Sequence, residues 1–373
     1  MKRGRSVRTF LLVGIALLSL FPEVWLTAAG VRAGLADKRP EPVLLKTFRV
    51  PGRLASLAFD SKGEKLVTVG WRESDPDKDQ MQAWTAGKSR GDIRIWNVAS
   101  GTEIAHFGDD AGGLFDVAIS PDDKTIVTAG RILGSPNKGE VRMWDAKTQK
   151  PIRTLAGHTH WVVSVAYSPD GKLIASGSFD RSTRVWDAPS GKQVAVLNFS
   201  KMLPRSLRFS TDGKTLSAGY ETGSVVLWDV QTLAKRAVFD AKGVILFSAD
   251  LSSDGKRVVA GGPEREVKPG AGQGGRIHVW DVASGREEQA IQLKDLVSGV
   301  AFSPSGKHFA AAGSLSRIWV SGTGEEVGDF PRDSGTSADK IRFSPDGKRL
   351  AIGSLADVTL WDVSGLGTAE KPK

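Results

Sequence analysis

The pentapeptide SPDGK occupies residues 168–172 and recurs unchanged at residues 344–348. Variants of it recur along the rest of the chain as DSKGE (60–64), SPDDK (120–124), STDGK (210–214), SSDGK (252–256) and SPSGK (303–307). Alternating apolar stretches flank the copies, and this alternation predicts β-strands. Proline fixes φ, aspartate hydrogen-bonds the local backbone and glycine adopts the left-handed conformation. We therefore interpret the pentapeptide as a hairpin turn without catalytic chemistry.

A tryptophan follows each turn at a regular distance, usually with aspartate after it, as in STRVWDAPSG. The seven tryptophans are separated by 48, 42, 42, 52, 39 and 42 residues and are Trp96, Trp144, Trp186, Trp228, Trp280, Trp319 and Trp361. A Trp-Asp repeat of about 40–45 residues with four strands resembles the WD40 family of β-propellers. The resemblance covers Val43 to Gly365 and implies an all-β fold, a single seven-bladed propeller of four-stranded antiparallel blades.

The stretch VLLKTF at residues 43–48 is similar to the outer strand PIRTL at 151–155, yet it precedes the first complete repeat. A ring that failed to join its ends would leave two exposed sheet edges. We therefore expect residues 43–48 to form the outer strand of the seventh blade and to close the 43–365 propeller. Residues 34–42 and 366–373 are expected to be tails.

The third repeat, LAGHTHWVVSVAYSPDGKLIASGSFDRSTRVWDAPSG, resembles the family most fully. The resemblance implies a buried hydrogen-bond chain with a structural role, formed by His158, Ser176 or Ser178, Asp180 and Trp186. The other repeats have no Gly-His pair, and none of them has an aspartate six residues before the tryptophan. We expect those blades to depend on apolar packing alone.

Residues 1–33 differ in composition from the rest of the chain. Four basic residues among the first eight precede the 12-residue apolar run FLLVGIALLSLF at 10–21, which is typical of a secretory signal peptide. The run is shorter than the about 20 residues that cross a bilayer. We expect cleavage after Ala29 or Ala33 and an exported protein, periplasmic or secreted. The alternative is an uncleaved segment that anchors the protein to a membrane.

Composition and motif spacing argue against most catalytic classes. The chain has no cysteine, which excludes a disulfide framework, a thiolate metal site and a cysteine nucleophile. The net charge of +9 falls to +5 without residues 1–33, and the excess is spread along the sequence, so nucleic-acid binding is not indicated. The five histidines lack zinc spacing. We expect no enzyme, no cofactor, no metal and a monomer.

Two motifs imitate ligand sites without completing them. GAGQGG at 270–275 satisfies the glycine pattern of a dinucleotide site but falls between two expected strands. Asp75, Asp77 and Asp79 imitate the start of a calcium loop, yet Gln80 and Ala86 stand where such a loop has glycine and glutamate. A solvated acidic loop is the preferred interpretation, and a weak calcium site is the alternative.

Insertions point to one face of the expected ring. They fall at 70–89, 131–138 and 262–274, between the second and third strands of blades one, two and five, on the face called the top in this family. Long loops on a rigid scaffold commonly carry binding residues, and tryptophan is enriched in interfaces. We expect a non-catalytic platform whose top face binds a protein or peptide through Trp71, Trp84, His160, Trp161 and Arg181.

The innermost strands carry charge at one equivalent position. Four blades have alanine there, whereas the fourth, fifth and seventh have Arg208, Asp250 and Arg342. We expect a structural ion pair between Arg208 and Asp250, because a charge between packed blades needs a partner. The alternatives are a channel that binds a small anionic ligand, or a hydrolase or lyase in the channel, with or without a metal.

Overall fold

The computed structural model describes residues 41–72, 89–199, 202–266, 274–331 and 338–366. The chain divides into two units, Met1–Lys38 and Arg39–Lys373, and every described residue belongs to the second. Within these ranges all regular elements are β-strands, and no helix there has the length and apolarity to cross a bilayer. Trp84 and the aspartates at 75, 77 and 79 lie outside the described residues.

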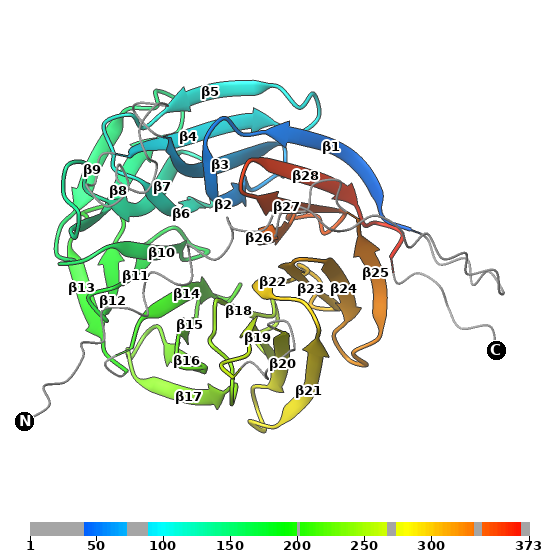
Figure 1. The fold of residues 1–373 in the computed structure, drawn as a ribbon. Helices are drawn as coiled ribbons and strands as arrows, with labels where there is room; N and C mark the ends of the chain where they lie inside the picture. Colours follow the sequence, from blue (N-terminus) through cyan, green and yellow to red (C-terminus); the bar gives the residue numbers. More distant parts are fainter. Residues whose placement is uncertain (1–40, 73–88, 200–201, 267–273, 332–337, 367–373) are drawn as a thin grey trace, which may run out of the picture. The chain divides into compact units, whose positions relative to one another are not determined.

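Seven four-stranded antiparallel sheets, the blades, succeed one another around a ring (Figure 1). Blades one and two contain β2 (Arg53–Phe59), β3 (Lys65–Arg72), β4 (Arg90–Asn97), β5 (Glu103–Phe107), β6 (Leu114–Ile119), β7 (Thr125–Arg131), β8 (Gly139–Asp145) and β9 (Pro151–Leu155). Blades three and four contain β10 (Val162–Tyr167), β11 (Leu173–Ser178), β12 (Thr183–Asp187), β13 (Gln193–Leu197), β14 (Pro204–Phe209), β15 (Thr215–Tyr220), β16 (Ser224–Asp229) and β17 (Lys235–Asp240). Blades five and six contain β18 (Ser248–Leu251), β19 (Arg257–Pro263), β20 (Gly275–Asp281), β21 (Glu287–Leu293), β22 (Val297–Phe302), β23 (His308–Gly313), β24 (Ser316–Val320) and β25 (Glu326–Phe330).

The seventh blade joins the two ends of the ring. It contains β26 (Ala338–Phe343), β27 (Arg349–Ser354), β28 (Asp357–Asp362) and, as its outer strand, β1 (Val43–Arg49). β1 pairs antiparallel with β28, with Phe48 opposite Val358. The predicted seven-bladed fold and its closure by the N-terminal strand are therefore confirmed.

The SPDGK turns show why this pentapeptide connects the first two strands of a blade. Ser168 donates a 2.6 Å hydrogen bond from Oγ to Asp170 Oδ1, and the same Oγ accepts the N–H of Leu173 at 2.9 Å. Gly171 has a φ of 70°, in the left-handed region that favours glycine. The letters of the motif are thus accounted for by turn geometry, as expected.

The apolar core lies between neighbouring blades. Trp186 of blade three, for example, packs in one cluster with Val127 and Val141 of blade two. Burying a large apolar side chain stabilises a fold by about 1.5–3 kcal/mol, so each tryptophan contributes to holding two blades together. This rigid packing fixes the innermost strands that surround the channel.

A β-bulge lies near the beginning of six innermost strands. It falls, for example, between Leu114 and Asp116 in β6 and between Pro204 and Ser206 in β14. A bulge re-aims the side chain of the extra residue. In β6 that residue is Phe115 and in β14 it is Arg205. Both side chains belong to the surface described next.

Candidate functional site

Blade three contains a polar chain around its tryptophan. His158 lies 2.8 Å from Asp180 through Nδ1 and 2.8 Å from Ser176 through Nε2. Trp186 donates from Nε1 to the same Ser176 Oγ at 2.8 Å. Ser178 lies outside this chain, because its hydroxyl donates to the carbonyl of His160 at 2.9 Å. Of the two serines left open by the sequence, Ser176 is the one in contact with the histidine.

The environment of this chain shifts two pKa values. Burial lowers the pKa of His158, which favours the neutral imidazole. Burial alone would raise the pKa of Asp180, but the hydrogen bonds from His158 and Ser182 outweigh it, so this pKa lies well below its ordinary value. The chain is a neutral histidine against a carboxylate, placed to orient a buried tryptophan.

The expectation that the remaining blades depend on apolar packing alone is wrong. Trp96 donates to Thr68 and Trp144 donates to Thr128, each at 2.9 Å, and Trp361 donates to Thr359 at 3.0 Å. In blades one and two the threonine stands at the place of Ser176, on the strand beside the tryptophan, and this was the sequence signal for those two bonds. In blade seven Thr359 lies on the strand of Trp361 itself, two residues before it.

Blades one and two also contain ion pairs close to their tryptophans. Arg94 lies between Asp92 at 3.1 Å and Glu103 at 2.6 Å, and Arg142 contacts Glu140 at 2.8 Å. In both blades an acid stands four residues, and an arginine two residues, before the tryptophan. These pairs supply polar contacts in blades without a Gly-His pair.

A chain of aromatic rings lies where second strands end and innermost strands begin. The ring of Trp71 at the end of β3 lies 6.2 Å from Phe115, and Phe115 lies 5.8 Å from Trp161. Trp161 lies 5.6 Å from Phe179 in the β11–β12 turn. We call Trp71, Phe115, Trp161 and Phe179, together with Phe247, the aromatic arc.

Arg205 connects Phe247 to the other members of the arc. Its Cζ lies 5.2 Å from the ring centroid of Phe179 and 6.0 Å from that of Phe247. A guanidinium over a ring is held by cation–π attraction and presents its donors beside an apolar surface. Phe247 is 37 % exposed. From Trp71 to Phe247, the aromatic arc extends over blades one to five, and it combines partly buried rings with the cation of Arg205.

The structure brings together three of the five predicted binding residues. Trp71 and Trp161 lie in the arc, and His160 lies 5.7 Å from Phe179. Arg181 is exposed at the tip of the β11–β12 turn, where its φ is 72°. Trp84 is outside the described residues.

Trp161 also has a structural contact. Its Nε1 donates to the carbonyl of Pro136 at 2.7 Å, and its ring lies 5.0 Å from the buried guanidinium of Arg131. Both partners belong to the blade-two insertion at 131–138, and Arg131 is the last residue of β7. Trp161 thus fixes this insertion against blade three as well as contributing to the arc.

Sequence reasoning missed Phe115, Phe179, Arg205 and Phe247. Phe115, Arg205 and Phe247 stand at one equivalent place, three residues before the charged or alanine position of the innermost strand. Aligning the repeats at that place would have shown large side chains in blades two, four and five. The aromatic character of FDRS at 179–182 was the signal for Phe179.

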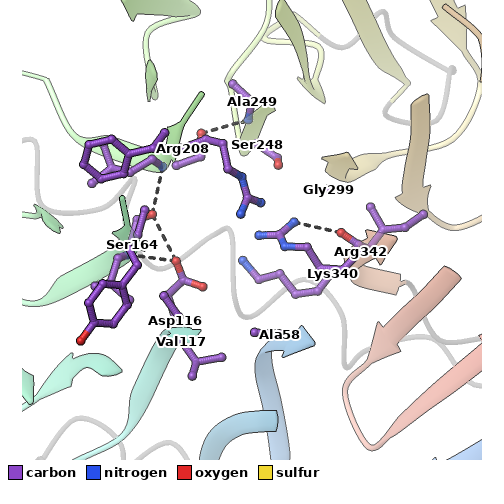
Figure 2. A pocket seen from close by; sticks show the side chains of 18 of the residues that line it. Ala58, Asp116, Val117, Ser164, Arg208, Ser248, Ala249, Gly299, Lys340 and Arg342 are labelled. Carbon is purple, nitrogen blue, oxygen red and sulfur yellow. Dashed lines mark hydrogen bonds between the residues drawn. The ribbon is translucent and has the colours of Figure 1, made fainter. Parts of the chain in front are cut away.

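The innermost strands enclose a channel cavity of about 270 Å³, lined by residues of all seven blades. Arg208 and Asp250 form an ion pair with 3.0 Å between Nε and Oδ1. Arg342, Lys340 and Asp116 also line the cavity, and the head groups of Arg208, Arg342 and Lys340 point toward its middle (Figure 2). Burial and the charge of Arg208 lower the pKa of Arg342 to about 10, and burial lowers the pKa of Lys340.

Comparison with known protein families finds a match for two of the repeats. The model of the family described as WD40, WD domain, G-beta repeat matches residues 149–187 and 191–229. The first match runs from the outer strand of blade two through the third strand of blade three, and the second is offset by one blade. No curated protein matches the chain.

Proposed function

Because the chain carries WD40 repeats on a seven-bladed β-propeller, we propose that it is a non-catalytic interaction platform that binds a protein or peptide on its top face. WD40 propellers commonly serve as platforms for protein interactions. The observation that supports a site on this face is the aromatic arc with Arg205 beside it. Binding hot spots are enriched in tryptophan and arginine, and exposed aromatic surface provides apolar area for a partner.

The shape and chemistry of the arc favour an extended segment of a partner. The rings follow one another from Trp71 to Phe179 at centroid separations of 5.6–6.2 Å. A row of rings can accept successive apolar side chains, while the donors of Arg205 and the exposed Arg181 can bind carbonyl or carboxylate oxygens. We propose that these two arginines orient the bound segment.

Affinity capture tests this function. The purified full chain is compared with a Trp71→Ala, Phe115→Ala, Phe247→Ala variant and a control in which Ile104, Ile152 and Val194 are changed to alanine. The control residues are exposed apolar side chains on outer strands, 51 %, 47 % and 51 % exposed. Mass spectrometry identifies the bound proteins, and each preparation must first melt cooperatively.

A partner that the wild type and the control retain and the arc variant loses supports the proposal. Truncation of central aromatic contacts costs about 2 kcal/mol or more, which weakens binding by about thirtyfold. Capture of the same proteins by all three forms, or of none, contradicts a top-face platform.

We also propose that the protein is exported, from the composition of residues 1–33. Intact-mass measurement of the protein from its native source tests this. A mature chain that begins at residue 30 or 34 supports cleavage, and a chain that retains residue 1 in a membrane fraction supports the anchored alternative.

A further inference from the structure

Two rings of equivalent positions on the innermost strands shape the channel, and most of their members are small. The first ring contains Ala58, Ala118, Ala166, Arg208, Asp250, Ala301 and Arg342. The second ring, two residues earlier on each strand, contains Ser56, Asp116, Ser164, Ser206, Ser248, Gly299 and Lys340. The long side chains among these small ones extend into the cavity, where Arg208, Lys340 and Arg342 meet (Figure 2).

Both channel acids already have close partners. Asp250 accepts from Arg208 through Oδ1 and from the backbone N–H of Phe302 through Oδ2 at 2.8 Å. Asp116 accepts from Ser56 at 2.6 Å and from the backbone N–H of Val165 at 3.0 Å. These carboxylates connect adjacent blades, and only Arg208 among the channel cations forms a salt bridge with either of them.

Among the described residues, Lys340 and Arg342 feel the favourable charge of Asp116 but make no close ion pair. In the part of the chain that the structure describes, neither forms a salt bridge within 4.0 Å. Arg342 donates one Nη1 hydrogen bond, at 2.9 Å, to the carbonyl of its neighbour Ile341. The cavity lining also includes Arg205, which forms a salt bridge with Glu221 at 3.3 Å. Four cations thus line the cavity, and Asp116 is the carboxylate among its lining residues.

This arrangement is electrostatically costly for the protein alone. Like charges that face one another in a partly desolvated cavity repel more strongly than they would in bulk water, and a buried charge without a partner is destabilising. An anion held between the cations would replace their mutual repulsion with attraction and would give each buried charge a partner. Guanidinium groups are suited to this because their planar fork binds two oxygens of a carboxylate or phosphate at once.

We propose that the central channel binds a small, multiply charged oxyanion, such as a phosphate or a small polycarboxylate, between Arg208, Arg342 and Lys340. Ser206 accepts the N–H of Ala249 at 2.9 Å, which leaves its hydroxyl hydrogen able to donate to the same ligand. The cavity volume of about 270 Å³ exceeds several times the roughly 30 Å³ occupied by one water molecule. It therefore has room for a small oxyanion together with bridging waters.

Isothermal titration calorimetry with the full chain tests the proposal. Inorganic phosphate and citrate are the two probes, and sodium chloride at matched ionic strength is the blank. We expect saturable binding of at least one probe and a rise in melting temperature that chloride does not reproduce, because a ligand of the folded state stabilises it by mass action. Which probe binds distinguishes a phosphate site from a carboxylate site.

Three variants locate the bound anion. Lys340→Met and Arg342→Met each remove one channel cation, and a hydrogen bond to a charged group is worth about 1.5–3 kcal/mol, so Kd should rise by about ten- to hundredfold. Lys172→Met is the matched control, because its side chain is 76 % exposed in a hairpin turn, and its Kd should not change. Without phosphate or citrate, the two channel variants should melt no lower than the wild type, since each removes a like charge.

Some outcomes would overturn the channel site. They are heat no larger than that of chloride, or Kd values unchanged in both methionine variants. If a methionine variant fails to melt cooperatively, Arg342→Lys replaces it, since lysine keeps the charge and loses the fork. A crystal soaked in selenate gives a measurement that needs no variant: an anomalous peak between the three cations supports the site, and a peak only elsewhere refutes it.

Discussion

Blades three and six have the same four strands and the same tryptophan position, but they hold that tryptophan differently. Trp186 donates to Ser176, which in turn contacts His158. In blade six Ala311 stands at the place of Ser176, and Trp319 stacks on Phe309 at 5.4 Å with 17° between the rings. The repeat fixes where the tryptophan lies, whereas each blade fixes how it is held.

The difference predicts unequal responses to mutation and to pH. A polar chain depends on every member, because removing one leaves buried partners unsatisfied. A stacked apolar pair has no proton to gain or lose. Three experiments on stability can sharpen or break this comparison.

His158→Ala should have the largest effect. The change removes one hydrogen-bond partner of Asp180, whose side chain is only 7 % exposed, and one of Ser176, while Asp180 keeps the hydroxyl of Ser182 and the backbone N–H of Thr159. Losing a hydrogen-bond partner costs a buried polar group about 1–3 kcal/mol, and two groups are affected, so we expect a loss of about 3 kcal/mol in the free energy of unfolding. Urea unfolding monitored by circular dichroism measures it. A loss below about 1 kcal/mol would show that the chain contributes little to stability.

Acidification should have the next largest effect. The pKa of His158 is lowered from 6.5 in the folded protein, so below pH 6.5 the unfolded chain binds a proton that the folded chain does not. The free energy of unfolding therefore decreases as the pH decreases, by up to about 1.4 kcal/mol per pH unit. The lowered pKa of Asp180 acts in the same direction below its ordinary value of 3.8. The groups that face His158 are Asp180, Ser176, Ser182 and Arg184.

The comparison that isolates this histidine is the pH profile of His158→Gln against that of the wild type. Burial also lowers the pKa values of His160 and His308, and both remain in the variant. The slope of stability between pH 6.5 and 5.5 should be smaller in the variant. Equal slopes would place the acid sensitivity at the other two histidines.

The smallest effect is the difference between Trp186→Phe and Trp319→Phe. Both changes remove a similar volume from between two blades, but Trp186→Phe also removes the hydrogen bond from Trp186 to Ser176. We expect Trp186→Phe to be more destabilising by about 1 kcal/mol, the net worth of one hydrogen bond. Thermal unfolding of the two variants side by side measures this. The reverse order would mean that stacking on Phe309 holds its tryptophan more strongly than the polar chain does.

The candidate sites were predictable only in part. The ion pair between Arg208 and Asp250 follows from two charges at one repeat position in adjacent blades, and the structure places them 3.0 Å apart. Trp71 and Trp161 were visible as tryptophans outside the repeat. The equivalent positions of Phe115, Arg205 and Phe247 could have been found by aligning the repeats, but the bulge next to Phe115, which re-aims its side chain, appears only in the structure.

The sequence by itself determined the number of blades, the hairpin turns and the closing strand. These follow from local chemistry: the left-handed glycine of the turn, the alternation of the strands and a repeat length that matches one blade. Only the tertiary structure decided which repeats share a surface. Lys340 and Arg342 face Arg208 because the ring brings the innermost strand of every blade to one axis, although more than 130 residues separate them along the chain. The same convergence assembles the arc from blades one to five, since side chains that meet across a ring need share no spacing in the sequence.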